Sequence, residues 1–224
     1  FAELGRYWHT LRYLKPVQWY GRVWFRLYRP KANAMATTPI RRSAIGNWQQ
    51  PVAREPSMLG PRRFSFLNHL HSLPPTGGWN DTSQVKLWLY NLHYFDDLCA
   101  KDANLRGEWQ QAILLRWIAE NPPTKGNGWE PYPTSLRIVN WVKWLSAGNP
   151  PVAGMAHSLA VQADWLRKKL ERHLLGNHLF VNGKALVFAG LCFDGAEGAY
   201  WLTKGLNLIA HQLPEQVLAD GGNF

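Results

Sequence analysis

Apolar residues recur every three to four positions along most of the chain beyond residue 84, which is the spacing of a helix with one buried face. This periodicity predicts helices over residues 84–100, 106–120, 135–146, 155–173 and 184–193, and one or two more over residues 196–219. No β-hairpin signature is recognisable. We therefore predict an all-α fold of successive helical hairpins, packed as a layered or toroidal α/α array.

The ends of these helices carry ordinary stop and start signals. Asn121-Pro122-Pro123 ends the second helix, because proline cannot continue it. Thr134 is a candidate N-cap for the third. A basic last turn followed by Gly176 is typical of the end of the fourth.

The segment before these helices has a different character. Residues 6–29 interleave aromatic residues with arginine at roughly helical spacing, interrupted at Pro16. This pattern indicates an amphipathic arm that docks on the domain or lies on an anionic membrane surface, and its rich apolar face favours docking. Residues 30–61 lack a clear period and are interpreted as a linker or irregular wrap. We divide the chain into an arm and linker (1–63) and a helical domain (64–224).

Charge separates the same two parts. Residues 1–63 hold 12 Lys and Arg against Glu3 and Glu55, whereas residues 64–224 hold 13 of each sign, so the net charge of +10 belongs to the first part. This excess favours attraction to a polyanion. Nucleic acid is a weaker interpretation, because no recognition motif accompanies the charge.

Composition narrows the class of protein further. With 224 residues, 46% of them hydrophobic, the chain can bury the core of one domain. Its 13 tryptophans suit stacking on sugar rings, although most are expected in the core. The two cysteines, Cys99 and Cys192, form no disulfide framework or metal-ligand spacing, so we expect no essential metal. No transmembrane run or signal pattern is visible, but Phe1 is not a start methionine, so an export signal can precede it.

Two polar segments carry the candidate chemistry. Residues 127–133 precede the third helix and residues 176–183 follow the fourth. Because successive helices alternate in direction, both segments fall on one rim and can face one cleft. The candidate catalytic residues are Asn177 and His178. The candidate substrate-binding residues are Trp129, Glu130, Tyr132, Arg137, Asn182 and Lys184.

These residue types suit the chemistry of a uronic acid. An amide such as that of Asn177 can stabilise the carboxylate, which acidifies the neighbouring C5 proton. A base then removes this proton and the C4–O bond breaks by β-elimination. His178 can supply a second donor, or act as the base when it is neutral.

Purely structural roles remain open for the same residues. Asn177 can be a C-terminal helix cap, Asn182 an N-cap for the helix starting at residue 184, and His178 a core imidazole.

Other catalytic patterns in the sequence are weaker. Asp96 and Asp97 are adjacent on a helix and point to different faces, and no phosphate loop, serine-hydrolase or zinc-protease motif occurs.

Four strings resemble the heparinase II/III-like polysaccharide lyase family. They are LWLYNLHYFDDL (87–98), GWEPYPTSLRIVNWVKWL (128–145), LLGNHLFVNGKALVFAGLCFDGAE (174–197) and EQVLADGGNF (215–224). Residues 6–29 also resemble the family's aromatic and basic lead-in. The resemblance implies an incomplete α/α toroid followed by a β-sandwich domain, and β-elimination on uronate polysaccharides.

The resemblance also assigns residues. Asn177 matches the carboxylate-neutralising asparagine, and His178 lies where related alginate lyases place a histidine. The family's catalytic tyrosine is expected after residues 219–222, and Tyr132 is not a matched substitute for it. The chain ends at Phe224, before that tyrosine and before the β-sandwich with its further histidine and frequent zinc. We therefore expect a truncated, nearly inactive part of a lyase.

The sequence thus predicts a polysaccharide lyase domain that acts on heparan-like, alginate-like or bacterial exopolysaccharide chains. The alternatives are a non-catalytic domain that binds acidic glycans, and an α/α-barrel glycoside hydrolase, for which no convincing acid pair is visible. An acidic polysaccharide substrate implies a periplasmic or secreted protein.

Overall fold

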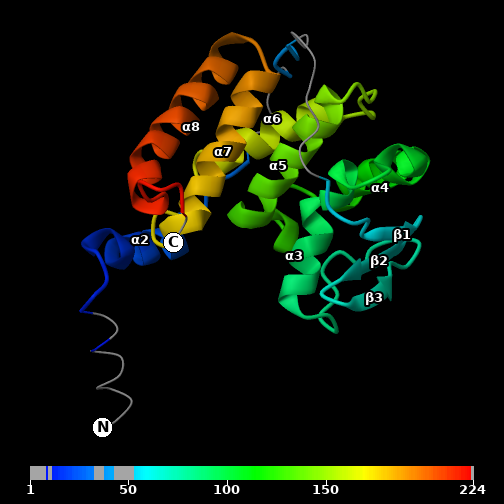
Figure 1. Ribbon diagram of the computed structural model, residues 1–224, viewed down its shortest axis with the longest axis horizontal. Coiled ribbons are helices and arrows are strands. Elements are labelled where there is room, and N and C mark those ends of the chain that lie inside the picture. Colours follow the sequence, from blue (N-terminus) through cyan, green and yellow to red (C-terminus); the bar gives the residue numbers. More distant parts are fainter. Residues whose placement is uncertain (1–8, 10–11, 33–37, 43–52, 223–224) are drawn as a thin grey trace.

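The computed structural model describes residues 9, 12–32, 38–42 and 53–222 (Figure 1). Its elements are α2 (Pro16–Leu27), β1 (Met58–Gly60), β2 (Arg63–Phe66), β3 (His69–Ser72), α3 (Lys86–Tyr94), η1 (Asp96–Cys99), η2 (Ala103–Arg106), α4 (Gly107–Glu120), η3 (Asn127–Trp129), α5 (Pro131–Ser146), α6 (Met155–Leu166), α7 (Gly176–Cys192) and α8 (Gly195–Gln216). Helices dominate, so the predicted all-α class is confirmed. The closure of the hairpins into a toroid stays a prediction.

The helices form two groups in space. Helices α7 and α8 run side by side as a hairpin next to α5 and α6, while α3, α4 and the small sheet lie on the other side of the molecule (Figure 1). Helix α5 contacts α3, α6 and α7 and therefore joins the two groups. The start of α5 lies beside the start of α7, where the ring centres of Tyr132 and His178 are 4.6 Å apart.

Helix α5 starts earlier than its sequence pattern predicts. It begins at Pro131 with Glu130 as its N-cap, so the prediction of Thr134 as the N-cap is wrong. Proline is tolerated in a first helical turn, because the missing N–H group would have no partner there anyway. Thr134 lies inside the helix, fully buried, and its hydroxyl donates to the Gly128 carbonyl at 3.1 Å.

Helix α7 also starts earlier, at Gly176 instead of residue 184, and α6 ends at Leu166. The predictions of Asn177 as a C-cap and Asn182 as an N-cap are therefore wrong. The chain turns into α7 through Leu175 (φ 58°) and Gly176 (φ 55°). A positive φ costs a leucine on the order of 1–3 kcal/mol. The surrounding structure holds this turn, and the polar segment becomes the first two turns of a helix.

The sequence pattern missed a three-stranded antiparallel sheet with the order β1-β2-β3. Phe66 pairs with His69 across a two-residue turn, in which Leu67 and Asn68 both have positive φ. Such turns usually contain glycine, and its absence here hides the hairpin signal. The sheet crosses the boundary drawn between residues 63 and 64, and the division into two parts stays a prediction.

The N-terminal part contacts the helical part at two places. Residues 38–42 run beside the α7–α8 turn, where the Arg42 N–H donates to the Cys192 carbonyl at 2.8 Å. Helix α2 approaches the α6–α7 turn closely at Gly21, where an added Cβ would lie 3.1 Å from the His173 Cβ. The Phe25 and His173 rings are 4.2 Å apart. The described part of the arm therefore docks on the domain. Residues 1–8, 10, 11, 33–37 and 43–52 of the predicted arm and linker lie outside the described residues.

Tryptophan fills much of the core, as predicted. Eight of the 13 tryptophans are buried, and Trp117 lies at the centre with its ring 5.5 Å from that of Trp141. The guanidinium of Arg137 stacks over Trp117 at 3.9 Å and donates to the Gln162 side chain at 2.8 Å. Burial lowers the pKa of Arg137 well below its usual value. This cationic side chain fixes α5 on the aromatic core.

His93 lies beside the same cluster and is fully buried. Its Nδ1 accepts from the Trp117 indole at 3.0 Å, which places the ring proton on Nε2, 3.0 Å from the Trp79 carbonyl. Burial, and then the positive charge of Arg137, lower the pKa of His93 from 6.5 to about 3. His93 is therefore neutral wherever the protein is folded near neutral pH.

This pKa shift predicts an acid-sensitive fold. As the pH falls from 6.5 toward 3, His93 takes up a proton in the unfolded chain but not in the folded chain. Protonation therefore stabilises the unfolded state, and folding stability that is present above pH 6.5 is lost progressively below it. In urea unfolding, lowering the pH from 7 to 5 should cost the wild type about 2 kcal/mol more than the His93→Gln variant. Equal losses in the two proteins would contradict this account.

Candidate active site

A cavity of about 360 Å³ opens where the starts of α5 and α7 meet. It is lined by Phe25, Tyr90, Trp129, Glu130, Pro131, Tyr132, Trp165, Lys169, Glu171, His173, Leu174 and His178, and we call it the Tyr132–His178 cleft. The rings of Tyr132 and His178 are 4.6 Å apart. The structure thus brings the two polar segments together, although the second enters as a helix start and not as a loop.

A hydrogen-bond network behind the cleft fixes its position. Asn182 is fully buried; its Oδ1 accepts from the Glu171 backbone N–H at 2.9 Å, and its Nδ2 donates to the Ser135 hydroxyl at 3.0 Å and to the Glu171 carboxylate at 3.2 Å. Ser135 in turn donates to the Pro131 carbonyl at 2.8 Å. One side-chain amide therefore connects α7, the α6–α7 turn and the first turn of α5.

Glu171 is a cleft residue that the sequence analysis did not single out. Its carboxylate is buried, and its Oε1 lies 3.2 Å from the Nδ1 of His178. A carboxylate can only accept a hydrogen bond, so the proton of neutral His178 resides on Nδ1 and Nε2 is left as an acceptor. The pair therefore has the arrangement of a general base and the carboxylate that orients it.

Asn177 has a different environment. It lies exposed in the first turn of α7, and its side-chain amide has no hydrogen-bond partner among the described residues. The first N–H groups of a helix lack partners within the helix and carry a partial positive charge. The amide of Asn177 and this helix start together suit a carboxylate ligand.

Three tyrosines add hydrogen-bond donors near the cleft. Burial, followed by the negative charges of Glu171 and Asp96, raises the pKa of Tyr132. Burial also raises the pKa of Tyr90 and of Tyr94, and the Tyr90 hydroxyl donates to Glu130. All three phenols therefore stay protonated at neutral pH. Tyr90 and Tyr94 are four residues apart on α3, a spacing that could have revealed them in the sequence.

Glu130 has partners of its own at the cleft wall. Besides the Tyr90 hydroxyl, it is bound by the Lys86 ammonium group, whose Nζ is 2.9 Å from the Glu130 Oε1. The predicted site residue is thus part of a small network that links α3 to the start of α5.

The remaining predicted site residues are buried or lie outside the cleft. Arg137 and Asn182 are 0% exposed and have no surface to offer a glycan, which corrects their prediction as substrate contacts; both instead position α5 and α7. Trp129 lines the cleft but is 3% exposed, and its indole donates to the Asn121 carbonyl at 3.1 Å. Lys184 does not line the cleft. Burial, and then the charges of Lys143 and Arg54, lower the pKa of Lys184.

Asp96 and Asp97 do not form a catalytic carboxylate pair. Asp97 is buried, accepts from two backbone N–H groups at 2.9 Å and pairs with Arg106 at 2.9 Å. Asp96 pairs with Arg54 at 2.7 Å and accepts from Asn140 at 2.7 Å. Each carboxylate is occupied by its own structural partners, which gives no support to the hydrolase alternative.

Metal and membrane features complete the description of this part of the molecule. Within the described ranges, no group of three or more His, Cys, Asp or Glu side chains is arranged to hold a metal ion. In the same part of the chain, none of the helices combines the length and apolar character needed to cross a membrane. Cys99 and Cys192 are both free thiols.

Comparison with known proteins identifies the class. Residues 99–224 match the family described as heparinase II/III N-terminus, and this match covers more than half of the chain, so the protein belongs to that family. The domain is therefore related to polysaccharide lyases. No curated protein and no solved structure matches the chain.

The network behind the cleft can be tested with two asparagines of the same helix. Asn182→Ala removes the partners of the Glu171 N–H group and of the Ser135 hydroxyl, so it should lower the free energy of unfolding by about 2–4 kcal/mol. Asn177→Ala is the matched control at an exposed position and should change it by less than about 0.5 kcal/mol. Similar effects of the two variants in urea unfolding would show that Asn182 is not the organising residue.

Proposed function

We propose that the Tyr132–His178 cleft binds a uronate residue of an acidic polysaccharide, and that the protein cleaves this polysaccharide by β-elimination. The observation that carries the proposal is the pairing of His178 with the buried carboxylate of Glu171 at 3.2 Å, one residue from Asn177 at the start of α7. Membership of the heparinase II/III N-terminal family supports it. We also propose that the protein works in the periplasm or outside the cell, where such substrates occur.

The first step is neutralisation of the uronate carboxylate. The amide of Asn177 and the free N–H groups at the start of α7 donate hydrogen bonds to it. Negative charge that develops on the carboxylate as the C5 proton leaves is stabilised by the same donors. These donors contribute to the rate because they bind the transition state more strongly than the ground state.

The second step is removal of the C5 proton. In its neutral form, His178 presents Nε2 as the acceptor, and Glu171 stabilises the resulting imidazolium. The electron pair of the C5–H bond forms the C4=C5 double bond, and the C4–O bond breaks. The departing oxygen takes a proton from a general acid, which the family resemblance assigns to a tyrosine that follows residues 219–222.

Tyr132 holds the sugar in this scheme. The Tyr132 ring lies against His178, and its protonated hydroxyl can donate to a sugar oxygen. Aromatic rings stack well on the apolar face of a sugar, while hydroxyl donors fix its orientation. The substrate therefore lies over the Tyr132 ring with its carboxylate toward the start of α7.

A lyase assay on the complete gene product tests the proposal. Polygalacturonate, alginate and heparin are offered in parallel, and the unsaturated product is followed by its ultraviolet absorbance. The wild type should produce this absorbance on at least one polymer. Asn177→Ala and His178→Ala should each lower kcat/KM by about 100- to 1000-fold, as expected for loss of one group that acts in the transition state.

Asn104→Ala serves as the matched control, because Asn104 is an exposed asparagine outside the cleft. It should retain wild-type activity. Elimination that persists unchanged in Asn177→Ala and His178→Ala would refute the assigned roles. Binding of a polyuronate without any elimination would instead identify a non-catalytic glycan-binding domain.

A further inference from the structure

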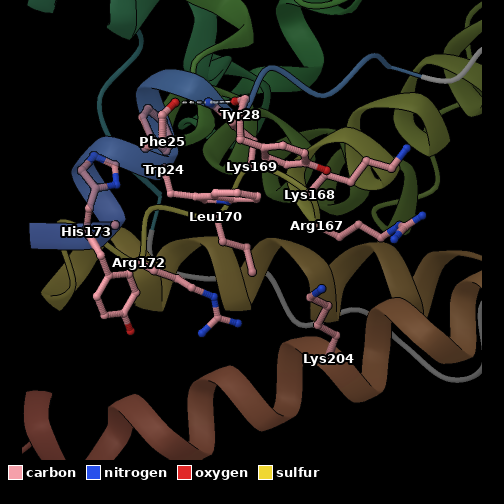
Figure 2. A pocket seen from close by; sticks show the side chains of 12 residues that line it. Trp24, Phe25, Tyr28, Arg167, Lys168, Lys169, Leu170, Arg172, His173 and Lys204 are labelled. Carbon is pink, nitrogen blue, oxygen red and sulfur yellow. Dashed lines mark hydrogen bonds between the residues drawn. The ribbon is translucent and has the colours of Figure 1, made fainter. Parts of the chain in front are cut away.

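A second concave surface lies between α2, the α6–α7 turn and α8. Two adjoining hollows of about 150 Å³ and 490 Å³ share Arg172 and Lys204 in their walls. Figure 2 shows the side chains of Trp24 in α2 and of Tyr28, just after α2, on one side, and those of Arg167, Arg172 and Lys204 on the other. We call this surface the basic–aromatic groove. Its larger hollow has the size of an ordinary ligand site, about 300–1000 Å³.

The groove carries more positive charge than its carboxylates can neutralise. Asp164 accepts both Arg167 and Lys168, each at 2.6 Å. Arg172 has no ion-pair or hydrogen-bond partner for its side chain in the part of the chain that the structure describes. Among the described residues, the ammonium group of Lys204 contacts only a neutral side chain, with the Tyr200 hydroxyl at 3.2 Å. The neighbouring Glu171 is directed away, toward Asn182 and His178.

Lys169, at the back of the groove, is a third cation that no carboxylate pairs with within the described ranges. Its ammonium group donates to the backbone carbonyls of Phe25 and Tyr28 and lies 4.0 Å from the centre of the Phe25 ring. Burial, and then the charge of Arg29, lower the pKa of Lys169. A bound anion would relieve this repulsion among cations.

Aromatic rings form the opposite wall. The Trp24 and Tyr28 rings stack with their centres 5.0 Å apart, and Trp24 remains 62% exposed although it lines the groove. A flat exposed indole beside a set of unpaired cations suits a ligand that has both an apolar ring face and negative charges. A sugar ring that carries carboxylate or sulfate groups combines these two features.

We propose that the basic–aromatic groove is a second binding site for acidic polysaccharide, separate from the Tyr132–His178 cleft. It shares the substrate class of the proposed function, and in that respect rests on it, but it contains none of the proposed catalytic residues. Phe25, Lys169 and His173 line both cavities, so the two sites are neighbours. A long polyanion held in the groove would be kept close to the cleft, which raises its effective concentration there.

The shape of the surface favours a polysaccharide over a membrane. The unpaired cations lie in a hollow behind α2, where a single chain can enter but a flat bilayer surface cannot. A membrane would instead contact the outward residues of α2, such as Trp19 and Val23, which are 45% and 59% exposed and do not line the groove. Variants of Trp19 and Trp24 therefore distinguish a membrane from a polysaccharide as the partner, because only Trp24 of these two lines the groove.

Titration calorimetry of the complete protein with heparin and with polygalacturonate tests the proposal. Arg172→Ala and Lys204→Ala should each weaken binding by up to about fivefold, because exposed charge contacts are individually modest. Trp24→Ala should weaken it by about tenfold, as expected for an aromatic anchor. Added salt should weaken wild-type binding.

Two matched controls make the result specific. Lys125→Ala removes one exposed positive charge outside the groove, and Trp19→Ala removes one exposed indole from the same helix. Both should bind as the wild type does. Circular dichroism of each variant confirms that its fold is intact.

Three outcomes would overturn the proposal. One is wild-type binding that none of the groove variants weakens, and another is no binding of either polymer. The third is binding to phosphatidylserine vesicles in place of polysaccharide, with Trp19→Ala and Trp24→Ala reducing vesicle binding equally. That result would identify α2 as a membrane-facing arm. His178→Ala separates this proposal from the proposed function, because it should lower kcat/KM for elimination by about 100- to 1000-fold and leave binding in the groove intact.

Discussion

The side-chain amide of Asn182 is the contact on which the candidate site depends. It is fully buried and uses its oxygen and both of its N–H bonds, on the Glu171 backbone, the Glu171 carboxylate and the Ser135 hydroxyl. A buried carboxylate is costly unless it is paired and hydrogen-bonded, so Glu171 can remain in the interior only while Asn182 and His178 hold it. Glu171 then orients His178. The strained turn at Leu175 persists because these contacts hold both of its ends.

The aromatic core fixes the start of α5, which forms one side of the same site. Arg137 lies over Trp117, and Trp117 donates to His93. The backbone before α5 is pressed so closely against His93 that a Cβ on Gly128 would lie 2.5 Å from its Nδ1. Glycine is therefore required at this position, and a rigid interior sets the start of α5. The cleft is thus formed by two helix starts, each fixed by buried polar groups and not by a flexible loop.

The sequence predicted the helical class, the meeting of the two polar segments and the burial of most tryptophans, because all three follow from periodicity, connectivity and composition. It did not predict the role of Glu171, whose neighbours at positions 167–169 and 172 are basic and make it look like one charge of a solvated surface. Arg137 was predicted to contact the substrate because it closely follows the polar segment of residues 127–133. Its stacking on Trp117 arises from residues twenty positions apart in sequence that meet only in the folded protein. The sheet was missed because Leu67 and Asn68 form its turn without glycine.

The most direct test of the central claim is a crystal structure of the complete protein with a short oligouronate, using His178→Ala so that the ligand is not consumed. The account predicts a uronate carboxylate within hydrogen-bonding distance of the Asn177 amide and of the first N–H groups of α7, with the sugar ring over Tyr132. It also predicts that Glu171 stays bonded to Asn182. An oligouronate bound elsewhere, with Asn177 facing only solvent, would contradict the assignment of this cleft as the active site.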